Sequence, residues 1–432
     1  MRSVGTLDEV VAGAVGGHRA SGAVVAVGGG EQVETGAANA DPEALYQIGS
    51  VTKVMTATLV LQHVERGEIG LDDPVADHLD DFWLDPPPAT RQVTVRHLLT
   101  HSSGIDRADG FIDTGPADDS VARFVAEVVG GAPLIHPPGE RWSYCNAGYV
   151  VLGRLVELLD GRPFDDALAA RIFAPLGLAA VTTARLDGTD RPVAAGHRYD
   201  PERGAVVPEP RLMPRSVGPA GNVVATAADL VTFADALTDG SGTLLGPDLA
   251  AAMLEPEVPM RTGHQGLGWT VPLPGVGSHG GGTPGGSALL VALPGRGALA
   301  AVADGPGAPA IGAAVRAHLF GTPEQLLGSR REPGTGPELA PEACAGRYGR
   351  YLVTHDVTCD EAGTLTVTTT YHDPLADLFP APRPLMLEPL GGGSWAGQRP
   401  YEDFPQLWDF SEPDVDGRPR LLMAGRLSAR VD

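Results

Sequence analysis

Lys53 is the only lysine in the 432-residue chain, and it follows Ser50 by three positions. Apart from histidine, every other basic side chain is arginine. A guanidinium cannot lose its proton in a protein, whereas a desolvated amine does so near neutral pH. Residues three apart share one face of a helix, so the amine can reach the hydroxyl. The pair predicts a serine nucleophile whose proton is carried by lysine.

A second candidate pair, Tyr144 and Asn146, flanks Cys145. A phenol can move a proton between a nucleophile and a leaving group, and a carboxamide can bind both a substrate carbonyl and an amine. The same residues could instead form a turn around a buried tyrosine, and their spacing leaves both interpretations open. Cys145 is predicted to be a packed thiol rather than a nucleophile, and His101 a structural residue.

The third cluster is rich in glycine: His279 precedes Gly280, Gly281 and Gly282, and the run continues to Gly286. Residues without side chains let a substrate approach the backbone closely, which suits an edge strand that presents N–H groups to an oxyanion. A glycine-rich turn is the plainer interpretation. A phosphate loop is excluded because the Gly-Lys-Ser/Thr ending is missing.

Hydrophobic patterns and turn residues indicate which elements position these clusters. Residues 51–66 predict a central, buried helix with little polar face that Gly67 ends, with Ser50 at its positive N-terminal end. Strands at both ends of the first 320 residues, with helices between them, predict one sheet that joins these two ends. The other predicted elements are a hairpin over 22–38, helices over 152–159, 227–237 and 308–319, and strands over 267–273, 287–293 and 298–304.

The composition changes near residue 321. Residues 321–339 are rich in proline and glycine and predict a linker. Beyond them lie short alternating segments typical of strands, at 346–353, 365–371, 407–410 and 420–427. We therefore expect an α/β fold, with one domain over 1–320 followed by a small antiparallel β domain over 340–432.

In order and spacing, Ser50–Lys53, Tyr144–Asn146 and His279–Gly281 resemble the S-x-x-K, Y-x-N and K-T-G/H-x-G elements of the serine β-lactamase and penicillin-binding-protein family. The resemblance is closest to the class C and esterase-like branch, which includes penicillin-binding-protein-type thioesterases and transacylases. It covers roughly residues 1–320 and implies an antiparallel sheet flanked by helices, with a helical subdomain. Residues 340–432 are similar to the lipocalin-like, barrel-like domain attached to many members.

The resemblance also implies how the proton moves. Ser50 would be the nucleophile that forms an acyl-enzyme. Lys53, paired with Tyr144, would accept its proton and return it to the leaving group.

Substrate contacts are implied in the same way. The N–H groups of Ser50 and Gly282, next to Gly281, would form the oxyanion hole. Asn146 would position the acyl donor. His279 would line the site and assist proton movement near neutral pH.

Two positions depart from the family pattern. His279 stands where many penicillin-recognising members have lysine, and Gly280 where they have threonine or serine. Both changes weaken recognition of a substrate carboxylate, so efficient cleavage of β-lactams or cell wall is not expected. No distinct glutamate that would activate a deacylating water is evident, which allows acyl transfer to an amine or alcohol.

These observations lead to a serine acyl-enzyme catalyst acting on an ester, amide or thioester, with a preference for a transacylase or peptide cyclase in small-molecule or nonribosomal-peptide biosynthesis. The alternative is an esterase or a D-amino-acid amidase or peptidase. A non-catalytic binding protein on the same scaffold is the more remote alternative. The expected partners are a small-molecule or peptide acyl donor and an amine acceptor; a carrier protein is a further candidate.

Charge and composition narrow the remaining classes. A formal net charge of −23 excludes nucleic acid and anionic membrane as partners. The sequence contains no apolar run of about 18 residues for a membrane span, and Met1–Glu9 lacks the layout of a signal peptide. Three cysteines without metal-ligand or disulfide spacing predict a cytoplasmic protein without a metal or other cofactor.

Overall fold

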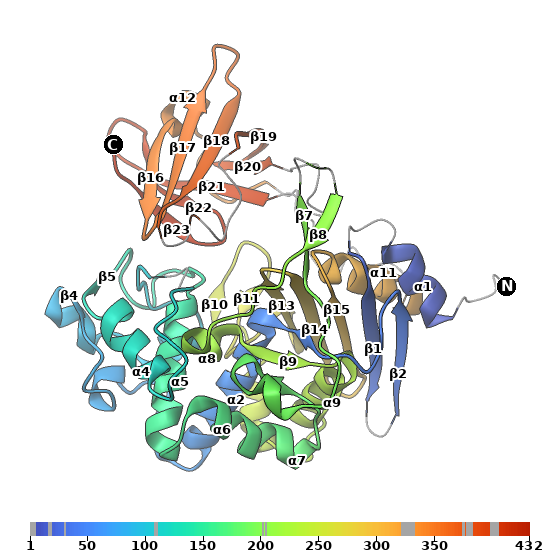
Figure 1. The fold of residues 1–432 in the computed structure, drawn as a ribbon. Coiled ribbons are helices and arrows are strands. Elements are labelled where there is room, and N and C mark those ends of the chain that lie inside the picture. The colour runs from blue at the N-terminus through green and yellow to red at the C-terminus, as the bar shows by residue number, and fades with distance from the viewer. Residues whose placement is uncertain are drawn as a thin grey trace.

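The computed structural model describes residues 6–15, 20–29, 32–107, 111–200, 203, 205–320, 333–373, 376, 383–397 and 406–432. An eight-stranded sheet carries helices on both faces, and a closed barrel of C-terminal strands stands beside it (Figure 1). The predicted α/β fold followed by an antiparallel β domain is thus confirmed. The domain limits 1–320, 321–339 and 340–432 stay predictions, and residues 321–332 lie outside the described part.

The central sheet joins the two ends of the first 320 residues, as predicted. Its order is β10-β11-β12-β13-β14-β15-β1-β2, and neighbouring strands are antiparallel. The hairpin predicted over 22–38 is β1 and β2, with residues 30–31 outside the described part. The strands are β1 (Ala23–Gly29), β2 (Gln32–Ala38), β10 (Val258–Pro259), β11 (His264–Gln265), β12 (Thr270–Leu273), β13 (Val276–Thr283), β14 (Gly286–Leu293) and β15 (Gly297–Ala303).

Helices cover the two faces of this sheet unequally. On one face α1 (Leu7–Val15) and α11 (Ala308–Phe320) pack side by side, with Val11 and Ile311 in a small apolar cluster (Figure 1). The main core lies on the other face, where α9 (Ala227–Thr238) contacts β1, β14 and β15. The residues of β15 are small and all buried, which lets helices approach the sheet from both sides.

Helix α2 (Thr52–Glu65) runs through this main core and is buried over nearly its whole length, as predicted, with Lys53, Gln62 and His63 among its buried residues. Its first turn differs from the prediction, because residues 49–51 form a 3-10 turn, η1 (Gly49–Val51), ahead of the α-helix. Gly67 follows the helix with φ of 70°, a conformation that glycine adopts without strain, so the predicted stop is confirmed.

The remaining helices and short strands surround α2. The helix predicted over 152–159 is longer and begins at Asn146, as α5 (Asn146–Asp160). The helix predicted over 227–237 is α9, and a capping box at Thr226 opens it. The other elements are α3 (Val95–Leu99), α4 (Ser120–Phe124), α6 (Phe164–Leu168), α7 (Ala174–Leu176), α8 (Gly218–Gly221) and α10 (Pro247–Ala252), and strands β3 (Tyr46–Gln47), β4 (Leu84–Asp85), β5 (Ala132–Pro133), β6 (Val181–Thr182), β7 (His197–Asp200), β8 (Ala205–Pro208) and β9 (Val223–Ala225).

The C-terminal barrel has eight antiparallel strands in sequence order, closed by β16 against β23. The predicted strand 365–371 is confirmed, but the single strand predicted over 420–427 is wrong. Gly425, with φ of 74°, breaks it into two strands joined by a turn at 424–426. The elements are α12 (Pro341–Cys344), β16 (Gly346–Arg350), β17 (Val353–Cys359), β18 (Leu365–Tyr371), β19 (Leu385–Gly391), β20 (Ser394–Gly397), β21 (Gln406–Pro413), β22 (Pro419–Met423) and β23 (Leu427–Arg430).

Polar contacts attach the barrel to the α/β unit. The backbone N–H of Tyr351 donates to Asp106 Oδ1 at 2.9 Å, and Arg261 binds Asp409 of β21. The barrel is therefore docked at defined points, on the side where α5 begins (Figure 1). Its likeness to lipocalins stays a prediction.

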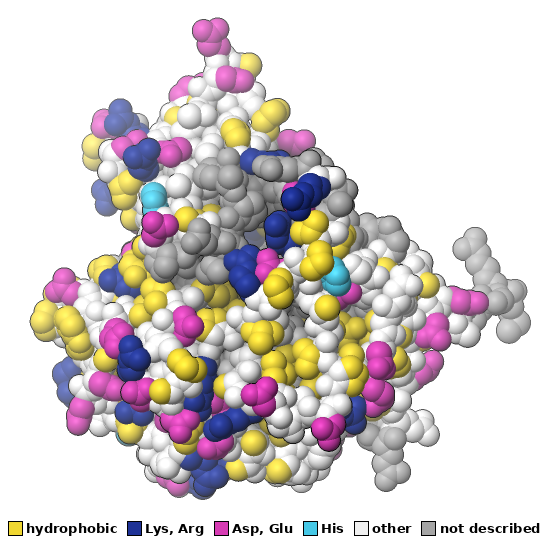
Figure 2. All heavy atoms as spheres, viewed as in Figure 1, with side chains coloured by type: hydrophobic (Ala, Val, Ile, Leu, Met, Phe, Trp, Pro, Cys, Tyr) yellow, Lys and Arg dark blue, Asp and Glu magenta, His cyan; other side chains and the backbone are white. Residues whose placement is uncertain are grey.

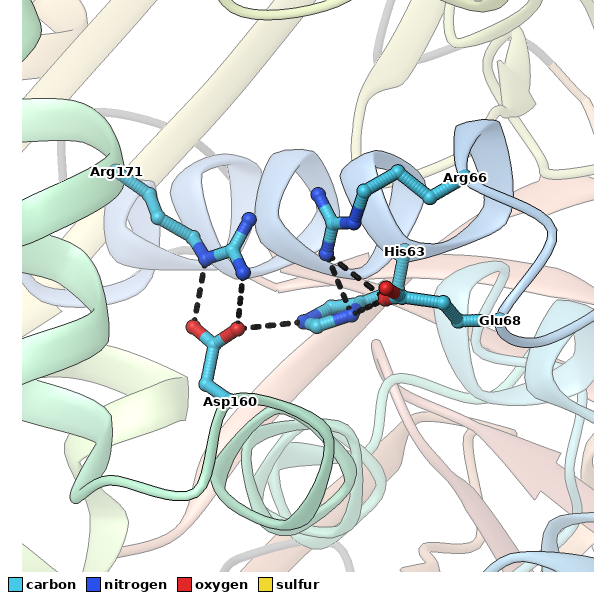
Figure 3. Close-up of polar contacts among 5 residues, drawn as sticks. All are labelled: His63, Arg66, Glu68, Asp160 and Arg171. Carbon is cyan, nitrogen blue, oxygen red and sulfur yellow. Dashed lines mark hydrogen bonds and ion pairs between the residues drawn. The ribbon is translucent and has the colours of Figure 1, made fainter.

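A buried polar cluster joins the C-terminal ends of α2 and α5 (Figure 3). His63 Nε2 lies 3.3 Å from Asp160 Oδ1, and both side chains are fully buried. Arg171 binds the same carboxylate with two nitrogens. On its other side, His63 Nδ1 lies 2.5 Å from Glu68 Oε2 and 2.7 Å from Arg66 Nη2. The cluster holds the far ends of the two helices together.

We expect Asp160→Asn to lower the free energy of unfolding by about 2 kcal/mol, because it takes a fully buried carboxylate away from His63 and from the partly exposed Arg171. Urea denaturation measures this. The matched control is Glu127→Gln, which breaks the exposed Arg123–Glu127 pair and should cost no more than about 0.5 kcal/mol. Equally small losses of unfolding free energy in both variants would contradict the conclusion that Asp160 holds the ends of α2 and α5 together.

Candidate active site

Ser50 and Lys53 meet at the N-terminal end of α2. Lys53 Nζ lies 3.0 Å from Ser50 Oγ, and the same nitrogen donates to the carbonyl of Ala220 in α8 at 2.6 Å. Lys53 is completely buried, whereas Ser50 is half-buried and stays accessible. The predicted contact between the amine and the hydroxyl is therefore present.

The surroundings of Lys53 favour its neutral form. Burial holds the pKa of the amine well below its ordinary value, and the nearby positive charge of Arg426 lowers it further. A neutral amine can donate an N–H to Ala220 while its lone pair faces the proton on Ser50 Oγ. The amine is thus arranged as a base.

Tyr144 completes the contact with the serine. Its phenol is hydrogen-bonded to Ser50, and its ring centroid lies 5.1 Å from Lys53 Nζ. Burial raises the pKa of Tyr144 to about 12, although the bond to Ser50 and the charge of Arg426 oppose this. The phenol therefore keeps its proton at neutral pH. These opposite pKa shifts are the ones that a lysine base beside a tyrosine acid would require.

The backbone around Tyr144 is fixed by its neighbours. Cys145 is the N-cap of α5, where its Sγ accepts the N–H of Gly148, and it is buried as predicted. The N–H of Cys145 donates to His101 Nδ1 at 3.1 Å, and the His101 ring lies 4.3 Å from that of Tyr144. His101 therefore acts on the site through position. Asn146, buried at the first turn of α5, lies two residues beyond the phenol.

Glycines bring β13 against the turn that carries Ser50. A Cβ on Gly281 would lie 1.9 Å from the carbonyl oxygen of Ile48 and 3.3 Å from the Ser50 nitrogen. A Cβ on Gly49, whose φ is 51°, would lie 2.8 Å from the Gly282 nitrogen. Only side-chain-free residues permit this approach. It places the two backbone nitrogens predicted for the oxyanion hole, those of Ser50 and Gly282, on neighbouring segments.

The same strand places His279 on the wall of the site. Registered pairs between β12 and β13 end at Ser278, whereas pairs with β14 continue to Thr283, so this half of β13 has the predicted edge character. His279 is buried, and its Nδ1 lies 2.7 Å from the carbonyl of Gly280. Burial lowers the pKa of His279 to about 4. The ring is neutral at pH 7, which suits a hydrogen-bonding wall better than the predicted proton carrier.

Arg426 is a site residue that the sequence did not indicate. It sits in the β22–β23 turn of the barrel, and its Nε donates to the carbonyl of Tyr144 at 3.2 Å. Its guanidinium carbon lies 5.3 Å from the centroid of the same ring. In Figure 2, basic side chains gather where the barrel meets the α/β unit. The barrel therefore reaches the site itself.

Two further observations concern only the described residues. No helix there is long and apolar enough to cross a membrane. Within the same ranges, no three His, Cys, Asp or Glu side chains gather as a metal ion would require.

Comparison with known proteins identifies the class. A family profile described as Beta-lactamase matches residues 7–322. Penicillin-binding protein 4 of Amycolatopsis lactamdurans is 40% identical over 280 residues, which cover 60% of this chain and 72% of that protein. The chain belongs to the β-lactamase family, and it is a serine enzyme that hydrolyses or transfers acyl groups.

Solved structures extend the likeness to the barrel. SurE, also solved with D-Leu, is similar with a TM-score of 0.76, 27% identity and coverage of 98% of both chains. A D-stereospecific amidohydrolase from Streptomyces is similar with a TM-score of 0.61 and 28% identity, over 73% of this chain and 98% of that one. The match to SurE includes the barrel. The match to the amidohydrolase leaves a part of this chain about as long as the barrel unmatched.

We expect Gly281→Ala to slow labelling of Ser50 by a fluorophosphonate roughly 100-fold, because the new Cβ pushes η1 away from β13 by about an ångström. The rate of probe incorporation measures this. In Gly280→Ala the new Cβ has the carbonyl oxygen of Ala288, at 4.0 Å, as its nearest neighbour, so its rate should stay within about twofold of the parent. A parental rate in Gly281→Ala would contradict the close approach.

Proposed function

We propose that Ser50 is the nucleophile of an acyl-enzyme, that Lys53 is its base and that Tyr144 is the proton relay. The observation that carries this proposal is the fully buried amine 3.0 Å from the serine oxygen. As Ser50 Oγ attacks the donor carbonyl, its proton passes to Lys53. The oxyanion is held by the N–H groups of Ser50 and Gly282.

Collapse of this intermediate breaks the bond to the leaving group. That group takes a proton from the phenol of Tyr144, and the phenol recovers one from the ammonium of Lys53. Both residues are then back in their starting states, with Ser50 acylated. Asn146 and His279 are proposed to hold the donor against the glycine strand.

For the second half-reaction we propose transfer of the acyl group to an amine, as in a transacylase or peptide cyclase. Among the described residues, the charged groups acting on Lys53 and Tyr144 include no carboxylate that would serve as a separate base for water. The nearby cation of Arg426 also disfavours a protonated acceptor, so an attacking amine would enter in its nucleophilic form. The new C–N bond forms as the bond to Ser50 Oγ breaks and the oxygen regains its proton.

The donor we propose is a small-molecule or peptidyl ester, amide or thioester. The residue that supplies its acyl group has the D configuration at the α-carbon. Two comparisons support the configuration, the solved complex of SurE with D-Leu and the D-stereospecific amidohydrolase. His279 and Gly280 do not supply a cation for a substrate carboxylate, which disfavours β-lactams. The net charge of −23 disfavours delivery by an acidic carrier protein.

Lys53→Arg should slow acylation roughly 10²–10⁴-fold, because a guanidinium cannot accept the serine proton. Fluorophosphonate labelling of Ser50 measures the rate, and thermal denaturation checks the fold. Lys53→Met, which fills similar space without a titratable group, should lose as much. Parental labelling in either variant would overturn the role of Lys53 as base.

Intact-protein mass after incubation with acyl donors tests the second half-reaction. The panel is a nitrophenyl ester, a D-amino-acid amide, a peptidyl thioester and a penicillin, with Ser50→Ala as the control. We expect an adduct on Ser50 from the ester and thioester that an added amine releases faster than water does. An adduct that only water clears would make the protein an esterase or amidase, and no adduct from any donor would contradict the acyl-enzyme itself.

A further inference from the structure

The β22–β23 turn makes two hydrogen bonds to the segment that carries Tyr144. Arg426 Nε donates to the carbonyl of Tyr144 at 3.2 Å, and the N–H of Leu427 donates to Ser143 Oγ at 3.1 Å. Gly425 gives the turn its left-handed residue, with φ of 74°. A two-point attachment fixes the backbone from which the phenol projects.

The turn also brings a permanent charge close to the amine. Two basic groups lie near the ring of Tyr144, with Arg426 Cζ 5.3 Å and Lys53 Nζ 5.1 Å from its centroid. Arginine stays charged when buried, whereas lysine can release its proton. A positive charge on Lys53 would therefore lie near the like charge of Arg426 beside the same ring, which favours the neutral amine.

We propose that Arg426 is a positioning residue of the acyl-transfer site, which fixes Tyr144 through its carbonyl and holds Lys53 in the unprotonated state through its charge. This inference rests on the proposed roles of Ser50, Lys53 and Tyr144. It makes the C-terminal barrel part of the catalytic apparatus, because the barrel alone supplies this residue. Truncating the barrel would then remove both the hydrogen bonds to the Tyr144 segment and the charge of Arg426.

Other groups that face these two side chains come from several elements. Lys53 is faced by Ser50 of η1, by Tyr144, Cys145 and Tyr149 at the start of α5, by His101 after α3, by His279 of β13 and by Arg426. Arg426 is faced by Tyr144, Cys145, Tyr371 of β18 and Arg350 of β16.

The sign of the pH effect follows from these charges. Arg426 lowers the pKa of both Lys53 and Tyr144. Acylation needs a neutral Lys53, so its rate falls as the pH drops through the pKa of this amine. Removal of the charge raises that pKa, and the acid limb of the rate profile moves to higher pH. A residue with a purely structural role would lower the rate at all pH values without moving the limb.

The experiment is the second-order rate constant for fluorophosphonate labelling of Ser50 as a function of pH, in the full-length protein. For Arg426→Gln we expect the acid midpoint to rise by about one pH unit or more. Arg420→Gln removes the same charge from an exposed position on β22 and should leave the profile unchanged. Ser143→Ala breaks the neighbouring contact without a change of charge, so its midpoint should match the parent.

An unmoved midpoint in a folded Arg426→Gln variant would overturn the proposal, whether its rate falls or not. Weaker probe saturation with an unmoved midpoint would assign Arg426 to ligand binding instead. If that variant does not fold, Arg426→Lys decides, because it retains the charge: the proposal requires the parental midpoint with a lower maximal rate. Failure of the proposed function looks different, since the parent protein would then show no labelling that depends on Ser50.

Discussion

The site depends on one constraint, which is that the amine of Lys53 lies out of water and within reach of a hydroxyl. Moving a charged ammonium into such a place costs several kcal/mol, so the amine gives up its proton instead. Two neighbouring groups fit the neutral amine. The carbonyl of Ala220 accepts its N–H at 2.6 Å, and Ser50 Oγ lies 3.0 Å from the same nitrogen.

Two helices turn this constraint into a shaped site. Helices α2 and α5 carry the serine–lysine pair and the Tyr144 segment at their N-terminal ends, and the cluster of His63, Asp160 and Arg171 ties their C-terminal ends. The glycine strand β13 closes against η1 because Gly281 has no Cβ. The barrel then adds Arg426 from a remote part of the chain. Four separate segments of the chain therefore build the site.

Much of this site could be predicted from residue types. A single lysine three positions after a serine identified the pair, and glycines after His279 identified the strand. The predicted sheet, which joins the two ends of the first 320 residues, followed from where the apolar strands lie. These signals are local in sequence or set by hydrophobic pattern, so one chain suffices to detect them.

Arg426 could not be predicted, because nothing local in the sequence marks it as a site residue. It is one of many arginines, and its value comes from a contact with Tyr144, 282 positions away. Apolar and polar residues alternate around it, which predicts one strand over 420–427, and only Gly425 indicates a turn there. The lowered pKa of His279, about 4, could not be predicted either, because it comes from burial in the folded site.

Since Lys53 is the only lysine, protein labelled with 13C at the lysine ε-carbon gives a single side-chain NMR signal that reports this amine. Titration of that signal tests the central claim most directly. The account predicts a midpoint far below the ordinary lysine value of about 10.4. A midpoint near 10.4 would mean that the amine is charged in the resting protein and would contradict its role as base.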